Sequence, residues 1–504
     1  MTSGLKRGAT WFAQEMGLTA LWNTGHDSWI IVAQRSLRMF GFGFINLILA
    51  LFFHELSFSD DQIGFFMSMT LWGDVLLSLF LTLVADRMGR RLILILGSLL
   101  MLGSGIAFAL SETYWVLLLA AVLGVISVSG SEIGPFRAIE ESTLAHLTVP
   151  ETRAYVLTWY VVLATFGTAI GVALCGWMVD YLQDRSGMTP LESYHTVFWV
   201  YAVVGIVNTI LSFILSRRCE LDPKLEPQNV PADATDVAEP NSETEPLLQN
   251  QENRESNEEQ QDSPPPKKDK KRGPFTSLSK ETQWTLFRLC ILFFMDSFAS
   301  GMVPFSLINY YVDGKFHLPK SRLGEIMSIT WLFSAISNMF AGSIAKRIGL
   351  IKAMVFTHFP STVFLALLPV PSSLTLTVLL LFARACLNSM DQAPRSAFLS
   401  AVVKPEERTT VMGIVNVLKT LSQSAGPWTT GGLAEHGLFW VAFVVAGSLK
   451  GTYDVLLLIM FVNARLHQHE QHEQPDGPKP AAQGTGRSAR NGQESTDTNA
   501  SQAG

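Results

Sequence analysis

Residues 85–91 read Ala-Asp-Arg-Met-Gly-Arg-Arg, and the middle of this stretch has a counterpart later in the chain. Asp86-Arg87-Met88-Gly89 matches Lys346-Arg347-Ile348-Gly349 at an offset of 260 residues. Three further landmarks repeat in the same order at offsets of 255 to 259: Glu132-x-x-Pro135 with Asp391-x-x-Pro394, Pro150-Glu151-x-Arg153 with Pro405-Glu406-x-Arg408, and Gly171 and Gly176 with Gly426 and Gly431. Landmarks that recur in order at nearly constant spacing predict an internal duplication into two homologous halves.

The composition of the chain is that of a membrane protein. Of its 504 residues, 48% are hydrophobic and only 16% are charged, whereas soluble domains carry about 25% charged residues. A helix that crosses a bilayer needs about 20 predominantly apolar residues. Such stretches occur near 37–56, 62–84, 92–111, 114–134, 154–177 and 197–216, and again near 285–307, 324–345, 350–370, 374–394, 409–430 and 438–461. The sequence therefore predicts an all-α integral membrane protein with twelve transmembrane helices in two pseudo-symmetric six-helix bundles.

Polar segments divide the chain into five parts. We expect an N-terminal segment over residues 1–36, six-helix bundles over 37–216 and 284–463, a disordered linker over 217–283 and a disordered tail over 464–504. If both termini lie in the cytosol, the only basic residues of the outward loops are Arg185, Lys315, Lys320 and Arg322. The positive-inside rule therefore predicts that the N-terminal segment, the linker and the tail are all cytoplasmic.

Other classes of protein find little support in the sequence. The basic run at 264–272 lacks interleaved aromatic residues and adjoins an acidic stretch, so we expect no nucleic-acid partner. The four cysteines show no C-x-x-C spacing, which argues against a disulfide framework or a zinc site. No nucleotide-binding loop and no constellation of catalytic or metal-ligating residues stands out. We expect no metal, no cofactor and no enzymatic activity.

Duplicated six-helix bundles allow a specific mechanism of transport. Two such bundles placed side by side form a central crevice, and rocking one against the other exposes a site near the middle of the bilayer alternately to each side. The duplication therefore predicts a secondary transporter of a small molecule. We expect a functional monomer that works in a lipid bilayer.

The loop at 85–91 resembles the signature loop of the major facilitator superfamily, and the resemblance extends over both halves. In that family the acid and the arginines of the loop form a charge network on the cytoplasmic face, which holds the halves together in the outward-open state. The resemblance implies that Asp86, Arg87, Gly89, Arg90 and Arg91 form this latch. Two departures are Thr82, where the family usually has glycine, and Lys346, which replaces the acid in the second copy.

The fifth predicted span contains a glycine pattern, Gly167-x-x-x-Gly171-Val172-x-x-Cys175-Gly176. It is similar to the antiporter motif of the drug:proton exporters in the same family, with valine in place of a proline and cysteine in place of a glycine. The eleventh span carries the proline version, Gly426-Pro427 followed by Gly431. An alternative interpretation is structural, because small residues at every fourth position let membrane helices approach closely.

Ionisable residues within the predicted spans are candidates for substrate or proton binding, because a charge inside the membrane is costly. The family resemblance implies that spans 1, 4, 7 and 10 line the cavity. Asp296 in span 7 and Arg384 in span 10 would then face it, and an isolated carboxylate there suits reversible protonation. Asp74 in span 2 is equally deep, and we expect it to pair with Lys419 in span 11.

The remaining charges allow alternative interpretations. Glu132 and Asp391 occupy equivalent places near the inner ends of spans 4 and 10, where they either carry protons or bind Arg137 and Arg395 to close an inner gate. Lys450 and Asp454 are four residues apart in span 12, a spacing that favours a structural ion pair.

Three functions are consistent with these patterns. The leading hypothesis is export of a drug-like compound or secondary metabolite, driven by a proton gradient and switched by protonation of Asp296 or Glu132. The second is proton-coupled uptake of an anion or organic acid held by Arg384. The third is a membrane sensor that does not transport. We expect the plasma membrane as the location, with a vacuolar or endosomal membrane as the alternative, because an acidic dileucine pattern ends at Leu247-Leu248.

Overall fold

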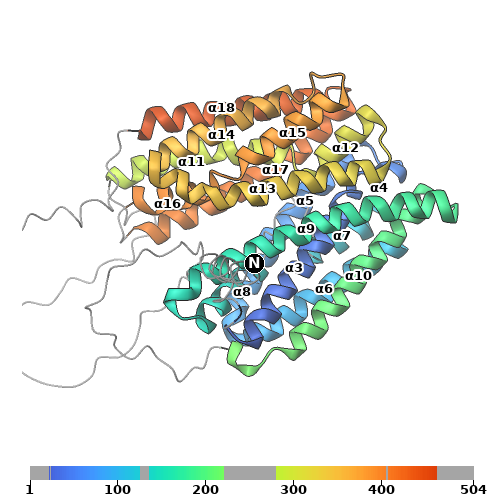
Figure 1. The fold of residues 1–504 in the computed structure, drawn as a ribbon, viewed down its shortest axis with the longest axis horizontal. Coiled ribbons are helices and arrows are strands. Elements are labelled where there is room, and N and C mark those ends of the chain that lie inside the picture. Colours follow the sequence, from blue (N-terminus) through green and yellow to red (C-terminus); the bar gives the residue numbers. More distant parts are fainter. Residues whose placement is uncertain are drawn as a thin grey trace, which may run out of the picture.

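The computed structural model describes Trp22, Ile126 and residues 24–124, 135–220, 280–403 and 407–462. Within these ranges every regular element is a helix (Figure 1). The N-terminal half contains α3 (His26–Asn46), α4 (Leu49–Glu55), α5 (Asp60–Met88), α6 (Arg90–Leu110), α7 (Tyr114–Leu123), α8 (Pro135–Leu147), α9 (Pro150–Ser186), α10 (Pro190–Ile214) and the short 3-10 helix η1 (Arg217–Cys219). The C-terminal half contains α11 (Lys280–Met302), α12 (Phe305–Phe316), α13 (Lys320–Ile348), α14 (Leu350–Leu367), α15 (Leu374–Asn388), α16 (Gln392–Val402), α17 (Arg408–Glu435) and α18 (Phe439–Phe461).

These helices form twelve membrane spans, six in each half. By length and composition, seven helical segments of the described chain are apolar enough to cross a membrane, and α7 and α15 are shorter apolar helices. Spans 1, 7 and 10 each consist of two helices with a break between them, at residues 47–48, 303–304 and 389–391. Span 4 comprises α7 and α8. The break in span 7 contains Pro304, which cannot donate a backbone hydrogen bond to a continuing helix.

Several helices extend beyond the predicted spans. α3 begins at His26 and not near residue 37, and α8 and α16 continue spans 4 and 10 to Leu147 and Val402. The polar side chains of Gln34, Arg35 and Arg38 obscured the start of span 1, yet all three are buried inside the N-terminal half. At the edges of the predicted linker, η1 and the first turn of α11 are helical. Apart from Glu220, the rest of the linker and the tail lie outside the described residues.

The two halves lie side by side, with α9 packed against α13 and α5 packed against α17 (Figure 1). Within each half the principal contacts are again equivalent, because α3 packs on α9 as α11 packs on α17. The halves also meet through α4 and α12, and we call this side of the molecule the α4/α12 end. The opposite side, where α8 and α16 lie, is the α8/α16 end.

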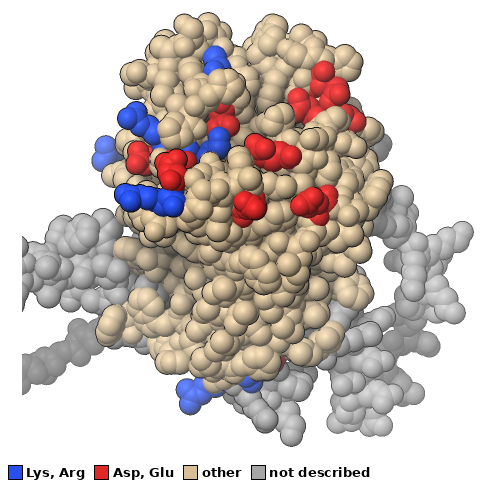
Figure 2. Space-filling model, turned by 90° about the vertical axis from the view of Figure 1, so that its right-hand side faces the viewer, with Lys and Arg blue, Asp and Glu red and all other residues tan. Residues whose placement is uncertain are grey.

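Charged side chains at the α4/α12 end are seen in Figure 2. Acidic side chains lie across the upper half of this view, and the Lys and Arg side chains lie mostly on its left, with a few more at its lower edge. The loops that end here include those with the few basic residues expected of the outward side. The face is therefore poor in the positive charge that marks a cytoplasmic surface.

Candidate functional site

The N-terminal half contains a buried ion pair between spans 1 and 4. The guanidinium of Arg38 on α3 donates a hydrogen bond to Oε2 of Glu140 on α8 at 2.8 Å. The hydroxyl of Tyr160 on α9 donates to the same oxygen, also at 2.8 Å. The guanidinium of Arg38 lies 4.4 Å from the centre of the Phe136 ring, and that of Arg35 lies 4.0 Å from the centre of the Tyr160 ring. Charge, hydrogen bonds and aromatic faces together offset the cost of burial.

The C-terminal half contains a larger buried network centred on Asp296 of α11. Its Oδ2 accepts a hydrogen bond from Arg395 of α16 at 2.6 Å, and its Oδ1 accepts one from Lys450 of α18 at 2.9 Å. Lys450 also donates to the hydroxyl of Ser300 at 2.7 Å, and Arg395 is hydrogen-bonded to Asp391. One carboxylate thus joins spans 7, 10 and 12.

The two ion pairs occupy equivalent positions in the duplicated halves. Arg38 and Asp296 are 258 positions apart, and Glu140 and Arg395 are 255 positions apart, within the range of offsets of the sequence repeat. Each pair links the first span of its half to the fourth. In the N-terminal half the first span carries the arginine and the fourth the acid, whereas in the C-terminal half the first span carries the acid and the fourth the arginine. Sequence patterns did not single out Arg38 as a candidate or place Glu140 in a span, because Glu140 lies beyond the predicted end of span 4. The repeat offset, applied to Arg395, would have found Glu140.

Two expected charge arrangements are not the ones observed. Asp296 was expected to be an isolated carboxylate, but it already has two cationic partners. Lys450 was expected to pair with Asp454 along α18, but it pairs with Asp296, and Asp454 is hydrogen-bonded to Nδ1 of His358 on α14 at 2.9 Å. The spacing along one helix permits a pair, but the neighbouring helices α11 and α14 bring each group a closer partner.

Arg384 on α15 differs from the other interior cations. It is partly buried, and among the described residues no carboxylate forms an ion pair with it. The interior of the C-terminal half therefore has a cation whose charge is not neutralised by a described side chain.

The other candidate charges have mixed outcomes. Asp391 is buried at the start of α16, where it contacts Arg395 of its own helix. Asp74 is buried on α5, and its pairing with Lys419 stays a prediction. The ammonium of Lys419 lies 5.7 Å from the centre of the Phe293 ring. Glu132 lies outside the described residues.

The expected latch surrounds the turn between α5 and α6. Gly89 has φ +89°, a left-handed backbone conformation that favours glycine, and its counterpart Gly349 has φ +88°. The backbone N–H groups of Arg90 and Arg91 donate to the two carboxylate oxygens of Glu220 at 2.7 and 3.2 Å. Glu220 therefore caps the start of α6 with a favourable negative charge.

The arginine side chains of this turn contact their own half. Arg90 donates to the hydroxyl of Ser142 on α8 at 2.7 Å, and Arg91 donates to the carbonyl oxygen of Phe213 on α10 at 3.0 Å. The side chains of Asp86 and Arg87 lie outside the described part of the chain. In this structure Arg90 and Arg91 thus hold α6 to the N-terminal half.

The motif glycines lie where helices approach closely. A Cβ added to Gly167 or Gly171 would lie within 3 Å of the α3 backbone, and one added to Gly426 would meet α11 equally closely. Gly176 and Gly431 lie between the halves, where an added Cβ would meet backbone atoms of Lys320 on α13 or Asp60 on α5. The carbonyl oxygen of Pro427 lies at the same contact, close to Gly64.

Hydrogen bonds close the α4/α12 end across the two halves. The hydroxyl of Ser306 donates to Oδ1 of Asn46 at 2.7 Å, and Nδ2 of Asn309 donates to the carbonyl oxygen of Asn46 at 3.1 Å. Asn46 and Ser306 are 260 positions apart, so nearly equivalent positions of the two repeats touch each other. This contact therefore lies close to the pseudo-two-fold axis, beside the helix breaks of spans 1 and 7.

Further hydrogen bonds between the two halves lie at the same end of the molecule as the Asn46 contact. Asp180 of α9 accepts hydrogen bonds from the backbone N–H groups of Lys320 and Ser321 at 2.9 and 2.8 Å, and so caps the start of α13 in the other half. The hydroxyl of Tyr310 on α12 donates to Asp60 at 2.9 Å. The indole N–H of Trp428 donates to Asp61 at 3.1 Å.

Two cavities of about 400 and 480 Å³ lie on the outer surface of the C-terminal half, one between α11 and α18 and the other between α14 and α18. Neither lies between the halves. Within the described ranges, no group of three or more His, Cys, Asp or Glu side chains is placed to hold a metal ion.

A duplicated helical bundle with broken spans and buried charges in its interior is the architecture of a membrane transporter. The sequence profile of the Major Facilitator Superfamily matches residues 33–288 and 289–493. The chain belongs to this family.

Known proteins extend the comparison. The chain is 35% identical over 439 residues to the uncharacterized membrane protein YJR124C of Saccharomyces cerevisiae, covering 86% of this chain and 94% of that protein. Its fold is similar to that of the nucleoside transporter NupG, with a TM-score of 0.58, 15% identity and coverage of 87% and 99% of the two chains. It is also similar to the inward-open conformation of the xylose transporter XylE from E. coli, with a TM-score of 0.60, 12% identity and coverage of 88% and 99%.

Proposed function

We propose that this protein is a proton-coupled secondary transporter that moves a small organic anion by alternating access. Family membership supports transport, and the duplicated halves supply the two bodies that must rock. The bonds from Asn46 and Asp180 to the other half support a state that is closed at the α4/α12 end. With both termini in the cytosol, which the distribution of basic residues favours, this state is inward-facing. We propose that the monomer is the functional unit.

The single observation that favours an anionic substrate is Arg384. A partly buried cation that forms no ion pair with a described carboxylate is costly in a membrane, and an anionic solute would reduce that cost when it binds. Asp296 is less suited to hold a cationic solute, because Arg395 and Lys450 already neutralise it. The charge of the C-terminal interior therefore favours an organic acid.

Proton coupling is proposed to act through the Asp296 network. Protonation of this carboxylate would remove the charge that holds Arg395 and Lys450, and so loosen spans 7, 10 and 12 from one another. Among proteins of similar fold is a D-xylose-proton symporter, with a TM-score of 0.59 at 13% identity. This likeness concerns the fold alone, and the coupling proposed here depends on Asp296.

Export of a drug-like compound is the competing candidate, and it was based on the glycine motif of α9. In the structure Gly167 and Gly171 lie against α3, and Gly176 lies against α13. Close helix packing accounts for all three glycines without an exporter. The anion candidate is therefore preferred.

A flux assay tests the proposal. The purified full-length protein would be reconstituted in liposomes, and flux of organic acids and of their neutral amide analogues would be measured with and without a pH gradient. We expect flux of anions only, stimulated by the gradient. Arg384→Gln should abolish it, whereas Lys352→Gln, which removes an exposed cation near the start of α14, should not.

Four outcomes would overturn parts of this proposal. Equal flux of acids and amides, or full activity of Arg384→Gln, would exclude anion recognition by Arg384. Unchanged pH dependence in Asp296→Asn would exclude coupling by this carboxylate. No flux of any solute in sealed, correctly folded proteoliposomes would favour the membrane sensor.

The membrane in which the protein works is proposed to be the plasma membrane. Leu247-Leu248, the basis of the vacuolar or endosomal alternative, lies outside the described residues. A fluorescent fusion, compared with its Leu247→Ala, Leu248→Ala variant, distinguishes the two locations. Internal fluorescence that moves to the cell surface in the variant would contradict the plasma-membrane proposal.

A further inference from the structure

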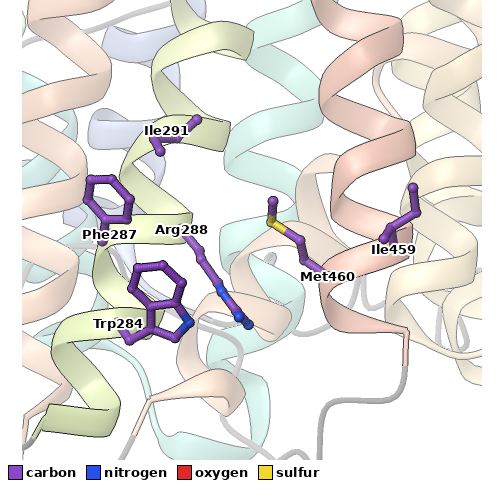
Figure 3. Close-up of a pocket in the computed structure, with 6 residues that line it drawn as sticks. All are labelled: Trp284, Phe287, Arg288, Ile291, Ile459 and Met460. Atoms are coloured by element: carbon purple, nitrogen blue, oxygen red, sulfur yellow. The ribbon is translucent and has the colours of Figure 1, made fainter.

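The smaller surface cavity, about 400 Å³, lies between the start of α11 and the end of α18 at the α8/α16 end. Figure 3 shows its lining, with Trp284, Phe287, Arg288 and Ile291 on α11 and Ile459 and Met460 on α18. The side chain of Arg288 extends into the gap between the two helices, and its guanidinium ends near the Trp284 ring. The cavity is thus an apolar groove with one cation inside it.

The apolar side chains of the groove face outward. Phe287 is 54% exposed, Ile291 42% and Ile459 69%, and Trp284 stacks on Phe287 with ring centres 5.6 Å apart. On a membrane protein such exposed apolar side chains face lipid, and tryptophan marks the interface between hydrocarbon and headgroups. The groove therefore opens to one leaflet of the bilayer.

Arg288 has the position and the free charge to bind an anion at that interface. Its guanidinium lies 4.9 Å from the centre of the Trp284 ring, and no carboxylate of the described chain forms an ion pair with it. By contrast, Arg38 and Arg395 each have a buried acidic partner. Arg288 is eight residues from the first residue of α11, or about 12 Å along the helix. A long arginine side chain at this depth can meet a lipid phosphate.

We propose that this groove binds an anionic phospholipid of the leaflet at the α8/α16 end. The phosphate would contact Arg288, and an acyl chain would lie along Phe287, Ile291 and Ile459. A free phosphate would gain nothing from these three apolar side chains, and a zwitterionic lipid would gain less from the single positive charge. The proposal depends on membrane embedding and not on the transport proposed above.

Native mass spectrometry of the full-length protein in mild detergent tests this site. Phosphatidylglycerol and phosphatidylcholine with the same acyl chains would be titrated separately, and lipid occupancy would be measured. We expect the parent to prefer phosphatidylglycerol. Arg288→Gln should lower the affinity for this lipid about fivefold, because a basic residue at a membrane surface contributes on that scale. Arg288→Lys should keep most of the preference.

Two controls make the test specific. Lys352→Gln removes an exposed cation at the same end of the molecule and should leave lipid occupancy unchanged. Ile459→Trp should fill the groove and weaken both lipids, with folding checked by size-exclusion chromatography.

The proposal is overturned if Arg288→Gln retains the preference of the parent or if Lys352→Gln loses it equally. Full displacement of the lipid by millimolar glycerol phosphate would also overturn it, since the site would then bind soluble phosphate. The readout is occupancy, so failure of the transport proposal would leave this result intact.

Discussion

Gly176 offers a direct test of whether the α4/α12 end is a closed gate. An added methyl group at this position would lie well under 3 Å from the carbonyl oxygen of Lys320 in the other half. Gly176→Ala should therefore force the halves apart at this end and favour the opposite, outward-open state.

The expected magnitude follows from the contact. A carbon atom and a non-bonded heavy atom are ordinarily about 3.5 Å or more apart, so α9 and α13 must move apart by about 1 Å to accept the added methyl group. Overpacking of this kind costs about 1–3 kcal/mol in the state that contains it. Since the contact is lost when the halves separate, the closed state alone carries this cost. The equilibrium should shift towards the open state by about 5- to 150-fold.

Electron–electron distance measurements can follow this shift. One spin label at Glu112→Cys and one at Ser372→Cys would lie in exposed turns of the two halves at the α4/α12 end. The four natural cysteines would be replaced first. Gly176→Ala should increase the population at long distance relative to the parent.

Gly167→Ala is the matched control, because its added methyl would be equally close to the carbonyl oxygen of Ser36 within the same half. It should lower stability without changing the distance between the halves. A folded Gly176→Ala protein with the distance distribution of the parent would refute the reasoning, as would an equal shift in Gly167→Ala.

Three further predictions concern stability and reactivity. Asp296→Asn leaves Arg395 and Lys450 without their shared carboxylate and should lower the free energy of unfolding by about 3 kcal/mol. The loss should be smaller when Asp296→Asn is combined with Lys450→Met. Thermal unfolding in detergent measures this loss, and an unchanged melting temperature would contradict it. Glu220→Ala removes the cap of α6 and should lower the free energy of unfolding by about 1 kcal/mol. Glu220→Gln should lower it by a smaller amount in the same assay. Equal losses in both variants would exclude capping as the reason. Burial raises the pKa of Cys219 to about 11, so its thiol is protonated at pH 8. The difference in ultraviolet thiolate absorbance between the parent and Cys219→Ser should therefore appear only near pH 11, and a difference that is complete by pH 9 would contradict the raised pKa.

The charged core illustrates what the sequence could indicate and what it could not. Arg384, Asp391 and Asp296 stood out as ionisable residues of the interior because such residues are rare in apolar stretches, and their part in substrate or proton binding stays a prediction. Arg38 and Glu140 were missed because Arg38 lies at the start of the predicted span 1 and Glu140 lies beyond the predicted end of span 4, and charged residues are ordinary at such positions. The partner of Lys450 was wrong because the spacing along α18 describes only one helix.

The sequence by itself determined the duplication, the number of spans and the class of protein, because hydrophobic length and repeated landmarks are properties of the chain read in order. Only the tertiary structure decided which charges meet, that Asn46 and Ser306 touch near the axis, and which end of the molecule is closed. Asp296 reaches Lys450 across 154 residues, and helical periodicity says which face a side chain occupies but not which helix lies opposite it. Which helix lies opposite is decided by the packing of the whole bundle, because each helix contact depends on many others.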